Sequence, residues 1–149
     1  MKRQSLAAAA LSGSPDDVEQ AFYEALGQAD LQQLMACWAE DDDIVCVQPD
    51  GQRCMGPAAI RAAFEALLAP GGLQIRPLHV HRIQALASAV HHLLEQVVVV
   101  TPQGQQTSWV TATNVYHKTP QGWRLVLHHA SPGSAEPPQD AAGQPAVLH

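Results

Sequence analysis

The chain has 149 residues, a formal net charge of −6, and apolar and charged shares of 46 % and 15 %. This length suits one domain, and the apolar share predicts a globular chain rather than a disordered one. The eight lysines and arginines are scattered along the sequence, whereas nucleic-acid binding needs a clustered basic surface that neutralises phosphates. We therefore expect no nucleic-acid partner, and no membrane partner because no apolar run is long enough to cross a bilayer.

The two ends and the cysteines indicate how the chain is organised. We predict a flexible leader over residues 1–13, a domain over residues 14–131 and a flexible tail over residues 132–149, which is rich in Pro, Gly, Ala and Gln. The leader faintly resembles a signal peptide, so export is the alternative to the cytoplasmic location that we expect. The cysteines are odd in number and lack metal-ligand spacing, which favours reduced thiols. We expect no cofactor.

Three helices are predicted in the first half of the domain. The first begins at Ser14, which can cap it, and Pro15 suits the first helical position because it lacks a backbone donor. Asp30 caps a second helix, whose buried face we extend to Trp38, and a third helix opens after Gly56. Apolar side chains recur at helical spacing in all three segments.

A strand over residues 44–48 precedes the third helix, and four long strands follow it. Their β-branched and aromatic residues favour extended structure, and the short connections predict antiparallel neighbours. The four strands are expected over residues 74–83, 89–101, 106–118 and 122–130. Helices followed by such a meander predict an α+β fold with the helices on one face of the sheet. The other face is too apolar for water alone, so we expect a homodimer through it.

Two stretches give the sequence a specific resemblance to a known superfamily. The first comprises residues 21–26, Ala-Phe-Tyr-Glu-Ala-Leu, and residues 37–41, Cys-Trp-Ala-Glu-Asp; the second comprises residues 114–117, Asn-Val-Tyr-His, and residues 122–126, Gly-Trp-Arg-Leu-Val. They resemble the opening helices and the last hairpin of SnoaL-like and ketosteroid-isomerase-like proteins, and of the association domain of calcium/calmodulin-dependent kinase II. The resemblance implies the nuclear transport factor 2-like fold, in which three helices pack in the concave face of a strongly curved antiparallel sheet around one pocket. This fold hosts isomerases, lyases, cyclases and pure binding or assembly domains.

The residues that steroid isomerase chemistry needs are missing from the matching positions. That chemistry needs a carboxylate base and strong hydrogen-bond donors. The resemblance places Gln48 where the family has its base and Phe22 where it has a donor tyrosine. Tyr23 follows, but one helical step turns a side chain by about 100°, and Asp50 beside a glycine is typical of a solvated turn. We therefore expect no steroid isomerase activity.

Glu95 stands out in the predicted strands, because it is a carboxylate on an otherwise apolar face. An unpaired buried charge is costly, so Glu95 needs a partner. A tight turn before the last strand would place Asn114 opposite Leu127 and His129 opposite Ala112. Glu95 and His129 would then form an acid–base pair on the inner face of the sheet.

The candidate pocket adds further residues to this pair. The catalytic candidates are Glu95 and His129, and the expected pocket residues are Gln48, Asn114, Trp38, Phe22 and Phe64. In the kinase association domain, arginines stand at the positions matching Glu95 and Asn114, so the resemblance implies a neutral or cationic ligand here. The alternative is that Glu95, Asn114 and His129 only satisfy one another beneath the sheet, and that Trp38 and Phe64 belong to the core.

The histidines raise the question of a metal site. His79 and His81 share one side of a predicted strand, and His91 and His92 lie on the next strand; histidines on neighbouring strands can bind zinc or nickel. No third ligand stands at a fixed spacing, so we interpret these residues as surface or interface histidines and expect no metal. The sequence thus predicts a homodimeric protein that binds a small apolar or weakly polar molecule. The alternatives are a lyase, cyclase or isomerase, and an oligomeric assembly domain.

Overall fold

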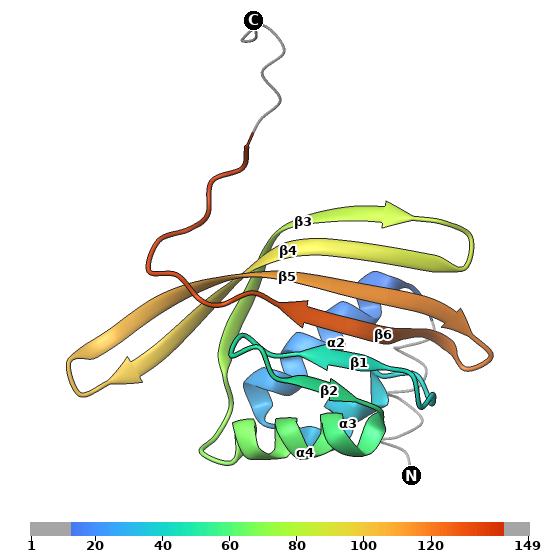
Figure 1. Ribbon diagram of the computed structural model, residues 1–149, viewed down its shortest axis with the longest axis horizontal. Coiled ribbons are helices and arrows are strands. Elements are labelled where there is room, and N and C mark those ends of the chain that lie inside the picture. Colours follow the sequence, from blue (N-terminus) through green and yellow to red (C-terminus); the bar gives the residue numbers. More distant parts are fainter. Residues whose placement is uncertain (1–12, 142–149) are drawn as a thin grey trace, which may run out of the picture.

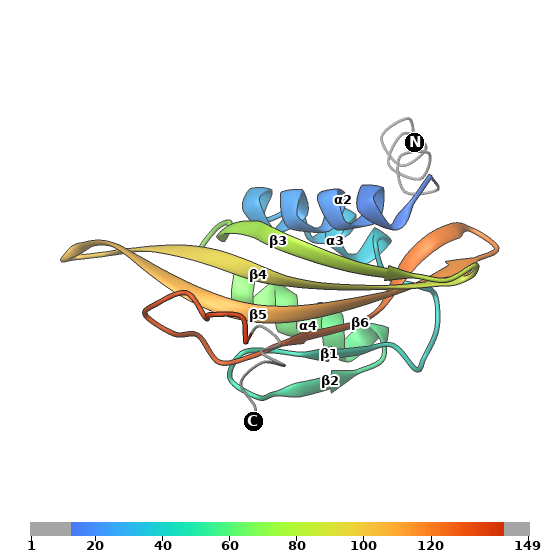
Figure 2. The ribbon, with the colours of Figure 1, turned by 90° about the horizontal axis from the view of Figure 1, so that it is seen from above.

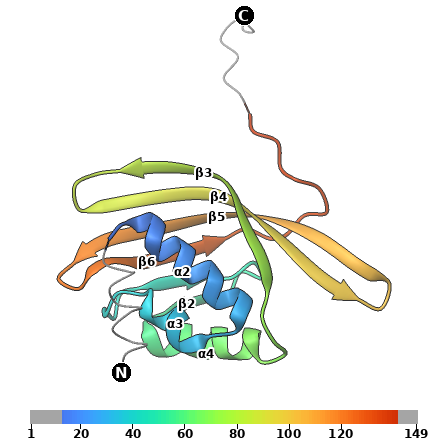
Figure 3. The same ribbon diagram turned by 180° about the vertical axis from the view of Figure 1, so that it is seen from behind.

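The computed structural model describes residues 13–141, which form one curved sheet and a helical layer. The sheet has six strands in the order β2-β1-β6-β5-β4-β3 (Figure 1). Figures 2 and 3 show that the helices lie on one face of this sheet, with α2 crossing it. The predicted α+β fold is confirmed. Among the residues described, no helix is both long and apolar enough to span a lipid bilayer.

The helices begin where the sequence offers caps. They span Pro15–Gln28 (α2), Leu31–Ala36 (α3) and Pro57–Leu68 (α4). Oγ of Ser14 accepts a 3.2 Å hydrogen bond from the backbone N–H of Asp17, and a carboxylate oxygen of Asp30 accepts one of 3.0 Å from Gln33. Both predicted caps are confirmed. The second helix is shorter than expected, because Trp38 leaves it to pair with Leu125 of the sheet.

The structure contains the strand predicted over residues 44–48, the four predicted long strands and one further short strand. The strands are Val45–Val47 (β1), Arg53–Met55 (β2), Gln74–Gln84 (β3), Ser88–Thr101 (β4), Gly104–Thr119 (β5) and Gly122–Ala130 (β6). Strand β1 pairs with β6 in parallel and with β2 in antiparallel orientation. Strand β2 is not predictable from the sequence, because three residues are too few to show the alternation of a strand.

The pairing of β5 with β6 differs from the expected register. An irregularity after Val115 shifts the ladder by one residue, so Asn114 pairs with His128 instead of Leu127. Successive side chains on a strand point to opposite faces, so a shift of one residue exchanges the inward and outward sets. His128 is therefore buried and His129 is exposed. The expected inward position of His129 is wrong.

The core lies between the helices and the sheet, and aromatic rings fill its centre. Phe22 is fully buried, and its ring lies 6.5 Å from that of Trp38 and 6.1 Å from that of Phe64, in edge-to-face arrangements. The Phe22 ring also lies 5.3 Å from the imidazole of His128. Such aromatic pairs stabilise a core beyond the area they bury.

The chain remains bound to the sheet after β6. Ser134 pairs with Trp109 through backbone hydrogen bonds of 2.8 and 2.9 Å. The attached part of the chain therefore continues beyond residue 131, where the sequence analysis placed the domain boundary. Most of the predicted leader, residues 1–12, and residues 142–149 of the predicted tail lie outside the described residues.

Candidate functional site

A cluster of polar side chains lies between α2 and the inner face of the sheet. Each member is no more than 6 % exposed, although this region is otherwise apolar. The members, called the buried polar cluster below, are Glu19, Tyr23, His91, Glu95, Asn114, Tyr116 and His128. Polar groups that are buried together must satisfy one another, because their hydration is lost.

The spacing of these residues explains why they meet. Glu19 and Tyr23 are four positions apart on α2, which places them on one helical face. The cluster residues of β4 are separated by four positions and those of β5 by two. Even intervals on a strand keep side chains on one face, so each element presents its polar pair to the same interior space.

Glu95 is held by a phenol. The Tyr23 hydroxyl donates a 2.7 Å hydrogen bond to Oε2 of Glu95 and accepts one of 3.2 Å from the side-chain amide of Asn114. Burial raises the pKa of Glu95 to about 7, although the bond from Tyr23 opposes the rise. Burial, together with Glu95, raises the pKa of Tyr23 well above its usual range. Tyr23 is therefore a permanent donor, and Glu95 is a carboxyl that exchanges its proton near neutrality.

His128 completes this half of the cluster. Its Nδ1 lies 2.5 Å from Oδ1 of Asn114, whose amide nitrogen is already engaged as a donor. The amide oxygen must therefore accept, so His128 donates from Nδ1 and turns Nε2 toward Oε2 of Glu95, 3.9 Å away. Burial lowers the pKa of His128 to about 4. At neutral pH the pair thus consists of a neutral imidazole beside a carboxyl that titrates.

Glu19 organises the other half of the cluster. Its Oε2 atom accepts hydrogen bonds from Nδ1 of His91 at 2.8 Å, from the Tyr116 hydroxyl at 2.8 Å and from Asn114 at 3.3 Å. Burial and the charge of Glu19 raise the pKa of Tyr116 well above its usual range, so this phenol also remains a donor. Asn114 bonds to both halves and links the two buried carboxyl groups through one amide.

A groove of about 540 Å³ lies between α2 and β3 and reaches this cluster. The groove, called the α2–β3 groove below, is lined by Asp16, Glu19, Gln20, Tyr23, Glu24, Ile75, Arg76, Pro77, Val80 and Arg82. Glu19 and Tyr23 belong to both the groove and the cluster, whereas Glu95 is not among the groove's lining residues. Tyr23 is therefore the group that connects the groove with Glu95.

The structure separates the predicted pocket residues into two sets. Glu95 and Asn114 meet in the buried polar cluster, while Phe22 and Phe64 pack in the aromatic core. Trp38 also belongs to the core, and it lines a second hollow of about 570 Å³ between α3, the segment 38–44 and the first turns of α4. Gln48 lies apart, just after β1, and its amide lies 3.9 Å from the sulfur of Cys46.

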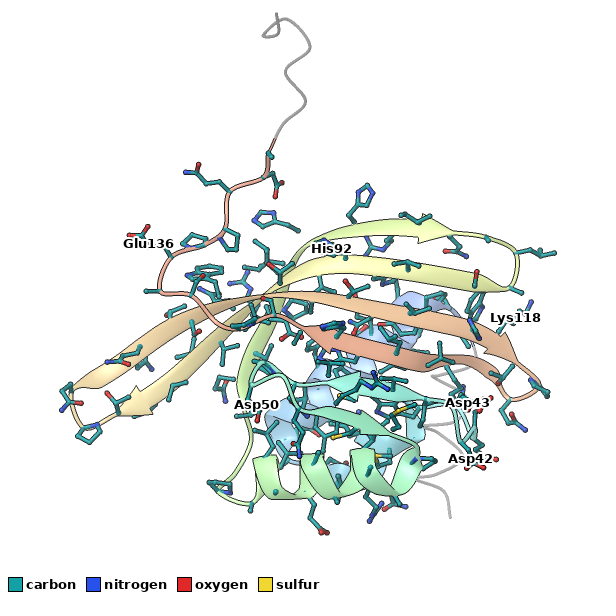
Figure 4. The ribbon with its side chains drawn as sticks, viewed as in Figure 1. Asp42, Asp43, Asp50, His92, Lys118 and Glu136 are labelled. Atoms are coloured by element: carbon teal, nitrogen blue, oxygen red, sulfur yellow. The ribbon has the colours of Figure 1, made fainter. Side chains whose placement is uncertain are left out.

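The remaining candidate residues lie outside the buried polar cluster, with the exception of His91. His129 is exposed on the outer face and does not join Glu95. Asp50 lies at the exposed turn between β1 and β2 (Figure 4) and accepts a 2.9 Å hydrogen bond from the backbone N–H of Gln52. His92 is exposed, in accord with a surface histidine. His91 is only 1 % exposed, so the expected surface or interface position is wrong for this residue.

Sequence reasoning missed five members of the cluster for identifiable reasons. Those members are Glu19, Tyr23, His91, Tyr116 and His128. Phe22 takes the family's donor position, and one helical step was expected to turn Tyr23 away from the pocket. The buried face of α2 is wide enough, however, to include both side chains. The interval between Glu19 and Tyr23 was an available signal, since it places two polar side chains on the buried face of an amphipathic helix.

The comparisons with known proteins agree with this fold. Residues 16–135 match the family described as the SnoaL-like domain. A proposed calcium/calmodulin-dependent protein kinase type II association domain from Thiobacillus denitrificans is 33 % identical, with 81 % of this chain and 96 % of that chain covered and a TM-score of 0.73. A proposed dehydratase of the NTF2-like family from Streptomyces avermitilis is 26 % identical, with coverages of 77 % and 91 % and a TM-score of 0.70.

A more distant likeness supports the fold alone. A calcium/calmodulin-dependent kinase II hub from S. rosetta is 20 % identical, with 79 % of this chain and 92 % of that chain covered and a TM-score of 0.63. No curated protein matches the sequence. The family match spans most of the chain, so the protein belongs to the SnoaL-like domain family, with the nuclear transport factor 2-like, cystatin-like fold of its structural neighbours.

Proposed function

We propose that this protein binds a small, mostly apolar or weakly polar molecule in the α2–β3 groove. The volume of about 540 Å³ lies within the range of roughly 300–1,000 Å³ that is usual for ligand sites. Ile75, Pro77 and Val80 supply apolar walls, and Tyr23, whose hydroxyl bonds to Glu95, links these walls to the buried polar cluster. The observation that carries the proposal is that Tyr23 lines the groove and bonds to the buried Glu95 behind it.

The charges around the groove favour a neutral or cationic ligand. Glu19 and Glu24 lie in the lining, and the third acid, Asp16, is already paired with Arg82 at 2.8 Å. This leaves one further guanidinium, that of Arg76, among the lining residues. The lining thus has three carboxyl groups and two guanidinium groups, and this excess of negative charge disfavours a carboxylate ligand.

A fragment screen with a blocked groove tests this proposal. We would expose the full-length protein to small neutral, cationic and anionic compounds and measure saturation-transfer NMR. Gln20 lines the groove and is exposed, so Gln20→Trp should fill the groove without disturbing the core. Gln32→Trp is the matched control, because Gln32 is exposed on α3 and lies outside the groove. We expect neutral or cationic fragments to bind the wild type and the control but not Gln20→Trp.

The opposite results would contradict the proposal directly. If no fragment binds the wild type, or if Gln20→Trp binds fragments as well as the wild type does, the α2–β3 groove is not the ligand site. If only anionic fragments bind, the site stands but the inferred charge preference is wrong.

A second candidate is acid–base catalysis of the lyase, cyclase or isomerase type. The pKa of about 7 for Glu95 favours it, because a general base or acid works best when its pKa lies near the working pH. The partner in this proposal is His128 instead of His129, since Nε2 of His128 lies 3.9 Å from Glu95. Gln48 and Phe22 lack the base and the phenol of steroid isomerases, so steroid isomerase activity is not part of the proposal.

Proton exchange provides a test that needs no known substrate. Enzymes that remove a proton next to a carbonyl group also exchange that proton with solvent deuterium. We would incubate a panel of small ketones and enones with the protein in deuterated buffer and follow the loss of proton signals by NMR. Exchange that requires Glu95, and therefore disappears in Glu95→Gln, would support catalysis. Wild-type rates equal to those of buffer alone would leave a binding protein.

We further propose that the protein forms a homodimer through the outer face of the sheet. Leu94 and Val98 lie on the outward set of β4 and are half-buried, and Val100 at the end of that strand is 76 % exposed. The name of the association domain from Thiobacillus denitrificans is in keeping with self-association. Light scattering should give twice the chain mass, and Val98→Glu should give the monomer mass. A ring larger than a dimer would instead favour the assembly reading.

We also retain the cytoplasm as the proposed location. Cys37, Cys46 and Cys54 are free and buried, which is typical of a chain that folds in a reducing compartment. Cell fractionation of the tagged, full-length protein is the test, and recovery from a secreted or periplasmic fraction would contradict it.

A further inference from the structure

His91 has an unsatisfied ring nitrogen in the interior of the protein. The residue is 1 % exposed, and its Nε2 atom bonds to no group among the described residues. Its other nitrogen, Nδ1, lies 2.8 Å from Oε2 of Glu19. A carboxylate only accepts hydrogen bonds, so Nδ1 carries a proton, and Nε2 is the ring nitrogen whose lone pair a metal ion could take. A buried acceptor without a partner is costly and calls for an explanation.

Nε2 of His91 faces a second possible metal ligand. The nearest carboxylate oxygen of Asp16, Oδ1, lies 3.9 Å away. Bonds from zinc to an imidazole nitrogen and to a carboxylate oxygen are each about 2 Å long. In a tetrahedral zinc site two such ligand atoms lie about 3.3 Å apart, so the exposed Asp16 carboxylate would have to move about half an ångström toward Nε2 to share one ion. The ligand atoms offered by Asp16, Glu19 and His91 all lie within 4.8 Å of one another.

We propose that His91 Nε2 and the Asp16 carboxylate bind a divalent transition-metal ion, with Zn²⁺ as the representative, at the edge of the α2–β3 groove. Imidazole with carboxylate suits zinc, copper and nickel better than calcium or magnesium. Glu19 has the role of an outer partner that fixes the imidazole, because metal-bound histidines usually donate their second N–H to a carboxylate. The remaining coordination positions would take water. This site shares Asp16 and Glu19 with the lining of the α2–β3 groove, but the proposal does not require that a ligand binds there.

Arg82 is the competing cation at this position. Its Nε donates a 2.8 Å hydrogen bond to Oδ1 of Asp16, and the side chains of Arg82 and Asp16 are 48 % and 58 % exposed. A surface ion pair of this kind contributes little stability and opens easily. The metal and Arg82 therefore compete for one carboxylate, which predicts that removal of the guanidinium strengthens metal binding. A merely structural cluster would not respond in this direction.

The test is a titration of the full-length, metal-stripped protein with Zn²⁺ by calorimetry, and with Co²⁺ by visible absorption. We expect one ion per chain. Asp16→Asn changes an exposed side chain and should lower the affinity roughly 10–100-fold, while Arg82→Gln should raise it. His92→Asn is the matched control, because His92 is exposed and pairs with His81 across the strands; its affinity should equal that of the wild type. The ¹⁵N resonance of His91 Nε2 should shift on addition of Zn²⁺.

Several results would overturn the proposal. Failure of the wild type to bind one equivalent of Zn²⁺ would do so, as would unchanged affinity in Asp16→Asn or unchanged or weaker affinity in Arg82→Gln. Loss of binding in His92→Asn would assign the ion to the surface histidines. Fragment binding is tested with Gln20→Trp, which leaves Asp16, Glu19 and His91 unchanged, so the two proposals fail separately. The exposed positions of Asp16 and Arg82 keep the test free of folding defects.

Discussion

The hydroxyl of Tyr23 donates a 2.7 Å hydrogen bond to Oε2 of Glu95, which lies 72 positions further along the chain. This bond joins α2 to β4 and connects the α2–β3 groove with a buried carboxyl whose pKa is raised toward neutrality. Because the Tyr23 phenol keeps its own proton, it donates to Glu95 and stabilises the charged carboxylate. The pKa of Glu95 nevertheless stays at about 7, so its carboxyl can still be protonated.

Replacement of Tyr23 by Phe should therefore change both stability and titration. The variant loses a buried hydrogen bond to a carboxyl, which costs about 1–3 kcal/mol, and the pKa of Glu95 should rise further above 7 because the Tyr23 bond lowers it. Tyr116→Phe is the matched control, since this hydroxyl bonds to Glu19 instead. It should lose similar stability and leave the Glu95 titration in place. Carboxyl ¹³C NMR against pH measures the Glu95 titration in both variants, and urea unfolding measures their stability. An unmoved Glu95 pKa in Tyr23→Phe would contradict the proposed hydrogen bond between Tyr23 and Glu95.

The raised pKa of Glu95 has a consequence for stability against pH. Between the ordinary value of 4.5 and about 7, the folded protein keeps a proton that the unfolded chain has released. The stability from this group is thus complete below pH 4.5 and is lost as pH rises through 7. Glu95→Gln cannot titrate, so it should be more stable than the wild type at pH 8, by up to about 3 kcal/mol.

Urea unfolding at several pH values measures this effect. Glu65→Gln is the control, because Glu65 is exposed on α4 and should leave the pH profile of the wild type unchanged. If Glu95→Gln and the wild type lose stability in parallel between pH 4.5 and 8, then Glu95 ionises normally in the folded protein.

His128 should have the opposite effect. Its pKa is lowered from 6.5 to about 4, so between these values the unfolded chain holds a proton that the folded protein lacks. Stability from this group rises with pH across that window, and it offsets much of the fall that Glu95 causes. His128→Gln removes the rise, and its stability should fall more steeply with pH than that of the wild type. His129→Gln is the exposed neighbour and should not alter the profile; equal profiles for both variants would disprove this account.

Helix caps and strand alternation in the sequence predicted the helix starts and the inward face of β4. Ser14 and Asp30 identify helix starts because their side-chain oxygens accept hydrogen bonds from the backbone N–H groups that are free in the first turn. Alternation on β4 also indicated that Glu95 faces the apolar interior, and the structure places it there. These features depend on neighbours in the chain, which a sequence displays directly.

The partners of Glu95 depend on contacts that a single sequence does not display. One irregularity after Val115 turns His128 inward in place of His129. The sequence has no glycine or turn residue at that point that would predict it. The meeting of Glu19 with His91, 72 positions apart, requires knowledge of how α2 crosses β4. Local patterns therefore identified Glu95 and Asn114 as inward-facing polar side chains, but not the residues with which they pair.

The buried cysteines should be chemically inert. Burial raises the pKa of Cys37 and of Cys46 to about 12 in each case, and the thiolate is the reactive form of cysteine. Ellman's reagent should therefore modify these thiols far more slowly in the native protein than in urea. Because reaction then follows unfolding, Phe22→Leu, which loosens the core that includes Trp38 and Cys37, should accelerate the reaction. Native-state labelling as fast as that of a free thiol would contradict the burial.

Asn114 tests whether the cluster behaves as one unit, because it donates to Tyr23 and Glu19 while it accepts from His128. Asn114→Asp keeps the shape but has no donors and places a carboxylate against Glu19. At pH 7 the loss of stability should be about 3–5 kcal/mol, as for other uncompensated buried charges. The loss should shrink as pH falls, since protonation of the new carboxyl restores a donor. Thr107→Asp, at an exposed position of the same strand, should cost far less. A loss in Asn114→Asp that is independent of pH would mean that the amide serves only to fill space.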